Sequence, residues 1–207
     1  MGFEGFLASF RMDPPGVPDG AWSLPAAGFR SLMEVAAGCS FEGGLYRLHT
    51  ARSASSARAL VENAFPEFAG RADVFSMDWL GRQFALDVER SEDQEPPVLM
   101  FEPGTGEALE IPATFRGLHE SELPRFPNEA LAREFFLEWA RPNGEALPLA
   151  LTECVGYRTP LFLGGVDEVE NLEVSDLDIY WSIFGQLRRE ALEHPGGTRI
   201  DDVQIDD

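Results

Sequence analysis

The stretch VFSMDWLGRQFALDVERSEDQEPPVLMFEPGTGEALEIP, residues 74–112, decides the fold. In its first run Phe75, Met77 and Trp79 fall on one face, which is the period of two of a half-buried strand. The alternation resumes from Phe84 after a break at residues 80–82. This pattern predicts an antiparallel hairpin whose tight turn uses the conformational freedom of Gly81.

A second hairpin follows in the same stretch. Residues 98–101 and 108–111 are apolar runs, and they flank residues 102–107, where one Pro and two Gly supply the residues of a turn. The two hairpins together form a four-strand antiparallel meander. Such a meander presents an apolar face that other elements must cover.

The covering elements are predicted on both sides of the meander. Apolar spacing indicates a short helix at residues 3–10, a second helix that begins near Pro25 and stops at Gly38, and a third capped by Ser55 or Ser56. The third helix follows a strand at residues 44–50. Its inward residues are expected to be Ala57, Leu60, Val61, Ala64 and Phe65.

Two more helices are predicted after the meander. The first runs from an Asn128 cap to about Arg141, and the second runs over residues 175–193 from a capping box at Ser175–Asp178. Between them, residues 160–165 are interpreted as a short strand and turn, and residues 172–174 as another strand. Trp79, Trp139 and Trp181 are expected to be buried.

Length and composition predict a single folded domain. The chain has 207 residues and 44% hydrophobic residues, which is enough for a sizeable core. The fold class is predicted as α+β: mainly an antiparallel β-sheet meander flanked by N-terminal and C-terminal helices. We expect a short N-terminal extension (1–19), one domain (20–194) and an acidic flexible tail (195–207). The tail is expected from its Gly and Asp content.

Charge narrows the choice of partner. The chain has 36 acidic and 16 basic side chains, a net charge of −20, and all its basic residues are Arg. Without Lys, phosphate loops of the Gly-rich Lys type and Schiff-base chemistry are excluded. The charge also opposes nucleic-acid binding and favours a basic protein partner. The alternative is that the acidity serves only solubility or reflects a genome that avoids Lys codons.

The sequence predicts no membrane span and no export signal. No apolar run has the length that crosses a bilayer, and the N-terminal residues lack a basic leader with a long apolar core. We therefore expect a cytoplasmic protein that does not bind a membrane.

Catalytic and metal sites are not indicated. His49, His119 and His194 are isolated, and each is expected to be a surface or strand residue. Cys39 and Cys154 are expected to be reduced, buried thiols. Asp78 could be a perturbed carboxylate, but beside a hairpin turn an Asp usually accepts hydrogen bonds from backbone amides. We expect no cofactor, no metal and no enzyme activity.

Three stretches resemble a known family. VFSMDWLGRQFALD, VLMFEPGTGEALEIP and ECVGYRTPLFLGGVDEVENLEVSDLDIYWSIFGQLR resemble the C-terminal domain family of type VI secretion immunity proteins, over about residues 70–192. Residues 28–50, with GCSFEGGLYRLH after a helix, are more loosely similar to the Gly-rich helix-to-strand entry of GAD-like and SUKH domains. The resemblance implies an α+β domain that protects its own cell by binding a cognate toxin encoded next door, in the best-known case a DNase.

A nuclease inhibitor benefits from an acidic surface, because a groove that holds phosphates carries positive potential. A run of six acids without a base is the candidate partner-binding surface, although a turn and the start of a helix could also account for these acids. We expect the acids to steer association and a few apolar side chains to anchor it. The six are Asp167, Glu168, Glu170, Glu173, Asp176 and Asp178.

Two alternatives remain: a general SUKH-like interaction module without a toxin partner, and a hydrolase with an unrecognised site. The neighbouring gene separates the first alternative from the immunity protein, because an immunity gene normally lies beside its toxin gene. The sequence leaves the oligomeric state and the toxin's chemistry open.

Overall fold

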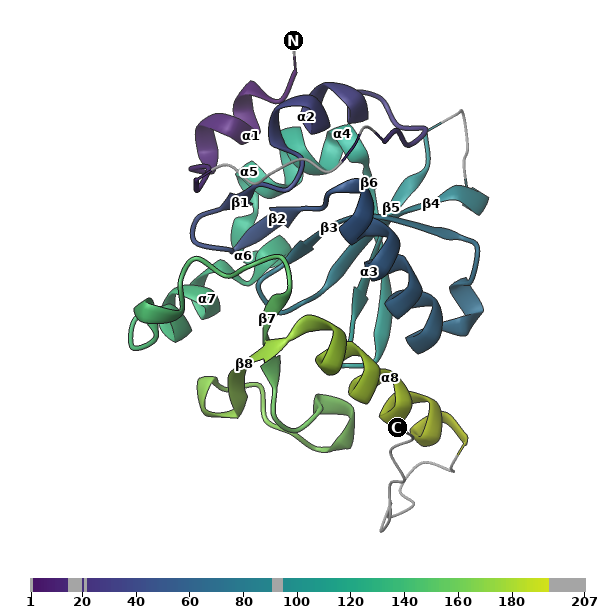
Figure 1. Ribbon diagram of the computed structural model, residues 1–207, viewed down its shortest axis with the longest axis vertical. Coiled ribbons are helices and arrows are strands. Elements are labelled where there is room, and N and C mark those ends of the chain that lie inside the picture. Colours follow the sequence, from purple (N-terminus) through teal and green to yellow (C-terminus); the bar gives the residue numbers. More distant parts are fainter. Residues whose placement is uncertain (1, 15–19, 21, 91–94, 194–207) are drawn as a thin grey trace.

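The computed structural model describes residues 2–14, 20, 22–90 and 95–193, and its centre is one antiparallel sheet. Six strands follow one another in chain order across this sheet (Figure 1). The arrangement confirms the α+β class and the predicted meander, which forms the last four strands. The strands are β1 (Ser40–Phe41), β2 (Tyr46–Leu48), β3 (Ala72–Asp78), β4 (Gln83–Asp87), β5 (Pro97–Glu102) and β6 (Glu107–Thr114).

The turn between β3 and β4 is held by Asp78. Its buried carboxylate accepts hydrogen bonds from the backbone amides of Leu80 and Arg82, at 3.1 and 3.0 Å, and from the Arg82 guanidinium at 2.6 Å. Gly81 has a φ of 76°, a left-handed conformation that glycine adopts without a Cβ clash. The predicted hairpin and the predicted role of Asp78 at the turn are therefore both confirmed.

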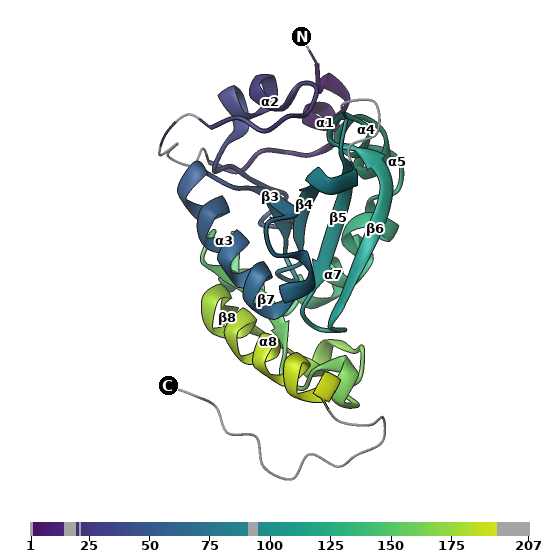
Figure 2. The same ribbon diagram turned by 90° about the vertical axis from the view of Figure 1, so that its right-hand side faces the viewer.

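Helices cover the sheet from both sides. α3 (Ala51–Ala64) packs against β3 and along α8 (Leu177–Glu193) on one side, while α4 (Phe115–Gly117) and α5 (Leu123–Arg125) lie on the other (Figure 2). The remaining helices are α1 (Glu4–Ser9), α2 (Phe29–Ala36), α6 (Pro127–Leu131), α7 (Arg133–Ala140), the π-helix η3 (Leu118–Glu122), and the 3₁₀ turns η1 (Pro66–Phe68), η2 (Val88–Arg90), η4 (Gly144–Ala146), η5 (Leu161–Leu163) and η6 (Val169–Asn171).

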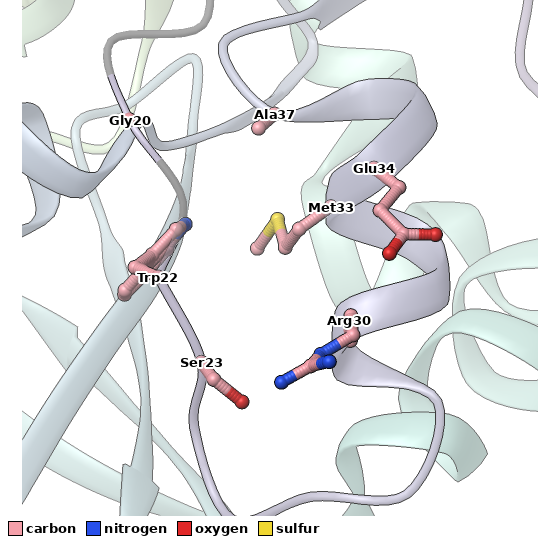
Figure 3. Close-up of a pocket in the computed structure, with 7 residues that line it drawn as sticks. All are labelled: Gly20, Trp22, Ser23, Arg30, Met33, Glu34 and Ala37. Atoms are coloured by element: carbon pink, nitrogen blue, oxygen red, sulfur yellow. The ribbon is translucent and has the colours of Figure 1, made fainter.

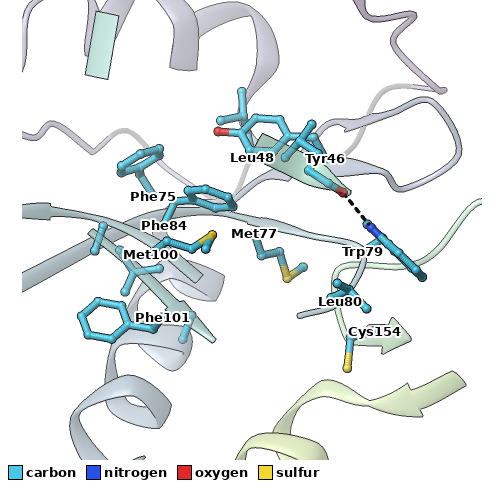
Figure 4. Close-up of a cluster of buried hydrophobic side chains, with 14 of the residues drawn as sticks. Tyr46, Leu48, Phe75, Met77, Trp79, Leu80, Phe84, Met100, Phe101 and Cys154 are labelled. Atoms are coloured by element: carbon cyan, nitrogen blue, oxygen red, sulfur yellow. Dashed lines mark hydrogen bonds between the residues drawn. The ribbon is translucent and has the colours of Figure 1, made fainter. Parts of the chain in front are cut away.

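Large aromatic side chains dominate the core. Tyr46, Phe75 and Phe84 come from the neighbouring strands β2, β3 and β4, while Phe101 and Trp79 lie apart from them in the same buried cluster (Figure 4). Phe101 contacts Phe65, and Trp79, directly after β3, contacts Phe135 and Trp139. The Trp79 indole nitrogen donates a hydrogen bond of 2.9 Å to the Leu131 carbonyl. Trp79, Trp139 and Trp181 are at most 2% exposed, as predicted.

A second, two-stranded sheet extends the molecule beyond β3. It consists of β7 (Glu153–Tyr157) and β8 (Leu172–Asp176), which pair antiparallel. The Val155 amide donates to the Trp79 carbonyl at 2.7 Å, so β7 is joined to the end of β3. β8 is the outer strand of this pair, and α8 begins directly after it.

The predicted helix at residues 128–141 is wrong in one respect: it is two helices, α6 and α7. Ala132 lies between them with a φ of 49°, and the Asn128 side chain does not cap α6 but accepts a hydrogen bond from the Glu134 amide in the first turn of α7. In a continuous helix the Leu131 carbonyl would accept the Phe135 amide. Here the break leaves that carbonyl to the Trp79 indole.

Three smaller predictions are also corrected. Thr50 caps α3 by accepting the Ser53 amide, rather than Ser55 or Ser56. α8 is capped by Asp176, which accepts the Ile179 amide at 3.0 Å, so the box predicted at Ser175–Asp178 starts one residue too early. Residues 161–163 form a 3₁₀ turn instead of a strand.

The N-terminal residues contribute to the same core as the sheet. Phe3, Phe6 and Phe10 are at most 2% exposed, and the Phe3 amide donates to the Glu120 carboxylate at 2.5 Å. The division into an extension, one domain and a tail stays a prediction. Of its segments, the tail at 195–207 lies outside the described residues, as does His194.

Candidate functional site

The six predicted acids lie on one continuous part of the chain, and all are exposed. Asp167, Glu168 and Glu170 belong to the connection between β7 and β8. Glu173 and Asp176 lie on β8, and Asp178 lies in the first turn of α8. These elements form one end of the molecule, opposite the end that carries α1 and α2 (Figure 1).

Asn171 fixes the shape of the β7–β8 connection. Its side-chain oxygen accepts the Thr159 amide at 3.0 Å, and its amide nitrogen donates to the carbonyls of Thr159 and Val166, both at 2.9 Å. Gly165 approaches so closely that an added Cβ would lie 2.1 Å from the Thr159 carbonyl oxygen. The acids of this connection are therefore presented on a backbone that is closed by internal hydrogen bonds.

Apolar side chains are exposed among the acids. Val166 is 54% exposed, Val174 is 43% exposed and Ile179 is 61% exposed. Leu163, on the same connection, is 38% exposed. Exposed apolar side chains within a charged rim are the arrangement found in protein interfaces, where the apolar groups lie at the centre.

Three of the six acids have partners within this part of the chain. Glu173 forms an ion pair of 3.2 Å with Arg158, Asp167 accepts the Tyr157 hydroxyl at 2.6 Å, and Asp176 caps α8. Glu168, Glu170 and Asp178 form no ion pair with any described residue. A purely structural role, in a turn or at the start of a helix, therefore explains Asp176, whose carboxylate caps α8. The carboxylates of Glu168, Glu170 and Asp178 remain exposed to solvent.

Beneath this surface lies Arg47, a residue that the sequence patterns did not single out. It is fully buried, and its guanidinium donates to the carbonyls of Asp78, Ala150 and Glu153 at 2.5 to 2.6 Å. Burial lowers the pKa of Arg47 to about 10, so the group stays charged at neutral pH. Its position between Tyr46 and Leu48 gave no signal, because all three residues of β2 are buried.

The two described histidines are buried and neither lies within a strand, so the expectation of surface or strand residues is wrong. His49, directly after β2, contacts Ser53 and Gln83, and His119 in the π-helix contacts the Phe115 carbonyl and the Tyr46 hydroxyl. Burial lowers the pKa of each to about 4. Neither ring meets the other or a cysteine among these partners, and both cysteines are free and buried.

Other possible sites offer little chemistry. Among the described residues, no three His, Cys, Asp or Glu side chains are placed to hold a metal ion. A pocket of about 480 Å³ is lined by Gly20, Trp22 and Ser23 on one side and by Arg30, Met33, Glu34 and Ala37 on the other (Figure 3). It lies at the α2 end of the molecule, away from the acids. No helix in the described ranges is long and apolar enough to cross a membrane.

Comparisons with known proteins match the region of the acids. Residues 133–188 match the family model described as the C-terminal part of the type VI secretion immunity protein Tdi1, which confirms the resemblance to this family over that part of the chain. A crystal structure of Atu4351 from Agrobacterium tumefaciens has a similar fold, with 15% identity, a TM-score of 0.59, and coverage of 89% of this chain and 88% of that chain. No curated protein matches the sequence.

Proposed function

We propose that this protein is a non-enzymatic immunity protein, which binds and neutralises a cognate type VI secretion toxin in the bacterial cytoplasm. The observation that carries the proposal is the family match at residues 133–188, because this segment contains β7, β8, most of α8 and all six exposed acids. The family supports an immunity role. The exposed acids and the exposed apolar side chains among them support the position of the partner surface.

The proposed toxin is basic and encoded beside this gene, with a groove that holds nucleic acid, as in a DNase. Support comes from the net charge of −20 and from the three carboxylates without an ion pair, Glu168, Glu170 and Asp178. Long-range attraction between opposite charges raises the rate of encounter and weakens with salt. The acids therefore steer the toxin to this end of the molecule.

Affinity comes mainly from the apolar side chains within the acidic rim. Val166, Val174 and Ile179 offer apolar area that a partner can remove from water, at roughly 25 cal/mol per Å² before the costs of association. Exposed ion pairs contribute little by comparison, about 0 to 1 kcal/mol each. Truncation of Ile179 should thus speed dissociation, while charge changes should slow association.

Stopped-flow association with the neighbouring toxin tests the proposal. In the variant E168R/E173R the association rate should fall at low salt and converge with wild type at high salt, while the melting temperature stays unchanged. The matched control is E4R/E34R, which changes the net charge equally but places it on α1 and α2 at the other end of the molecule. Glu173 also forms an ion pair with Arg158, so the single variant E168R is measured too, because it changes the charge of the surface without breaking that ion pair.

Equal association rates for both double variants at every salt concentration would remove this surface from the proposal. If wild type does not bind the toxin at all, the alternative of a general interaction module without a toxin partner is favoured.

A further inference from the structure

The hydrogen-bond alternation of the β7–β8 pair shows which backbone groups of β8 face outward. The Arg158 amide donates to the Asn171 carbonyl at 2.7 Å, and the Leu177 amide donates to the Thr152 carbonyl at 2.9 Å. The register between these two bonds is continuous. Hydrogen-bonded pairs alternate along an antiparallel ladder, so 154/175 and 156/173 are bonded pairs, and 155/174 is not.

In the non-hydrogen-bonded pair, Val155 and Val174, the backbone amide and carbonyl of each residue point away from the other strand. On β7 this is visible directly, because the Val155 amide points outward and donates to the Trp79 carbonyl. By the same geometry, the amide and carbonyl of Val174 point away from β7, on the outer edge of the two-stranded sheet. Among the described residues no backbone group pairs with Val174 on that edge, and Val174 is 43% exposed.

The other sheet edges are protected. At β1, Met12 forms a bridge with Phe41, and the Asp13 amide donates to the Ser40 carbonyl at 2.9 Å. β6 contains Pro112, which lacks an amide hydrogen, and Glu110 on this strand pairs with Arg90. Proline and charge on an edge strand discourage pairing with another chain. The edge of β8 has no proline and carries an exposed valine at its centre. Its two charged residues, Glu173 and Asp176, are both acidic, so they oppose an acidic strand and favour a basic one.

We propose that the toxin binds this protein by strand addition: an extended, Arg- or Lys-bearing segment of the toxin pairs with the free edge of β8, with its central hydrogen bonds to Val174. The proposal rests on the proposed function, because it specifies how the same partner is held. Strand addition takes affinity from main-chain hydrogen bonds and specificity from alternate side chains. Here the alternate side chains of the added strand meet Val166 and Ile179 or the carboxylates.

Charge decides between a toxin segment and a second copy of this chain. In an antiparallel pairing centred on Val174, a second copy would place its Glu173 diagonally opposite the Glu173 of this chain, and the like charges of two such acidic strands oppose association. A basic segment instead meets Glu168, Glu170 and Asp178, which form no ion pair with any described residue. The edge is therefore suited to a basic strand of another protein.

The test compares V174P with V174A in binding to the neighbouring toxin. Proline removes the outward amide, which β7 does not use, whereas alanine keeps the amide and removes most of the side chain. V174P loses the hydrogen bond that the Val174 amide donates to the added strand, and its ring also clashes with that strand. The toxin affinity of V174P should therefore be about tenfold or more lower than that of V174A. Near-UV circular dichroism and thermal melting check that both variants fold.

Amide hydrogen exchange in the wild-type complex gives an independent measurement. The Val174 amide should exchange fast in the free protein and become protected in the complex, while the Glu173 and Ser175 amides, which are bonded to β7, are protected in both. Equal affinities of V174P and V174A, or a Val174 amide that still exchanges fast in a tight complex, would overturn strand addition and leave the immunity function standing. Absence of any toxin binding by wild type would defeat the proposed function itself. Self-association of the free protein through this edge, detected by light scattering, would assign the edge to a second copy.

Discussion

The indole nitrogen of Trp181 donates a hydrogen bond of 2.9 Å to the carbonyl oxygen of Gly81, which ties α8 to the turn between β3 and β4. Trp181 is 1% exposed and also contacts Phe65 on the other side of the ring. This one side chain therefore links the sheet, the end of α3 and the helix that follows the candidate surface.

Replacement of Trp181 by alanine should lower the free energy of unfolding by about 3 to 5 kcal/mol, because it leaves a large cavity in the core. W181F keeps most of the ring and loses the hydrogen bond, so its cost should be smaller. Urea denaturation measures both. A transition midpoint of W181A equal to that of wild type would contradict the core position of this residue.

Gly185 allows the close approach of α8 to α3. A Cβ at this position would lie 2.8 Å from the Cβ of Ala64, which is closer than side-chain contacts allow. G185A should thus cost about 1 to 3 kcal/mol by overpacking, despite the better helix propensity of alanine. G144A is the control, because nothing lies within 4 Å of a Cβ there. Equal melting temperatures for the two variants would refute the close approach.

Acid should destabilise the fold through its two buried histidines. The pKa of His49 and of His119 is lowered by burial to about 4, below the unfolded value of 6.5. Stability is therefore fully present above pH 6.5 and is lost as the pH falls toward 4, by roughly 3 kcal/mol for each ring. The raised pKa values of the buried Asp78 and Glu102 act in the opposite direction.

The variant H119F isolates the contribution of His119 to this loss of stability in acid. Five aromatic rings contact His119, so a phenyl ring can pack in the same place without a group that titrates. The variant should be less stable at pH 7, because the Tyr46 hydroxyl keeps its hydrogen bond to Ser76 but loses the one to His119. Its stability should fall less steeply between pH 6.5 and 4. Parallel curves of unfolding free energy against pH would show that His119 does not titrate in this range.

Replacement of Asn171 should lower both the stability of the protein and its affinity for the toxin. N171A removes three hydrogen bonds within the β7–β8 connection and should lower stability by about 1 to 3 kcal/mol. Toxin affinity should fall as well, because the connection must be ordered again on binding. N143A, which removes one hydrogen bond at the end of α7, is the control. Unchanged affinity of N171A would separate the shape of the connection from toxin binding.

The sequence predicts best where a strong local period coincides with a turn residue. Gly81 marks the first turn of the meander, Gly38 marks the end of α2, and the apolar face of residues 177–187 marks α8, so local patterns predict all three elements. The break at Ala132 gave none. Its cause is tertiary: the Leu131 carbonyl accepts the Trp79 indole, and no pattern within residues 128–141 contains that information.

The same limit applies to the candidate surface. Charge alone indicated that the six acids are exposed, and their exposure is observed. The exposed edge of β8 could not be predicted, because the pattern of Leu172 and Val174 is that of a strand with one buried face, and only the topology shows that β8 has a single neighbour.

Arg47 carries a consequence for how the chain reaches its final state. Its guanidinium can lose its water only when Ala150 and Glu153 have arrived, more than a hundred residues later in the chain. Contacts of such sequence separation form late, since a long loop must close before they are gained. During synthesis the sheet strands emerge first and wait for β7. The buried guanidinium of Arg47 therefore gains its hydrogen bonds, and the proposed toxin-binding surface its final shape, only after β7 has left the ribosome.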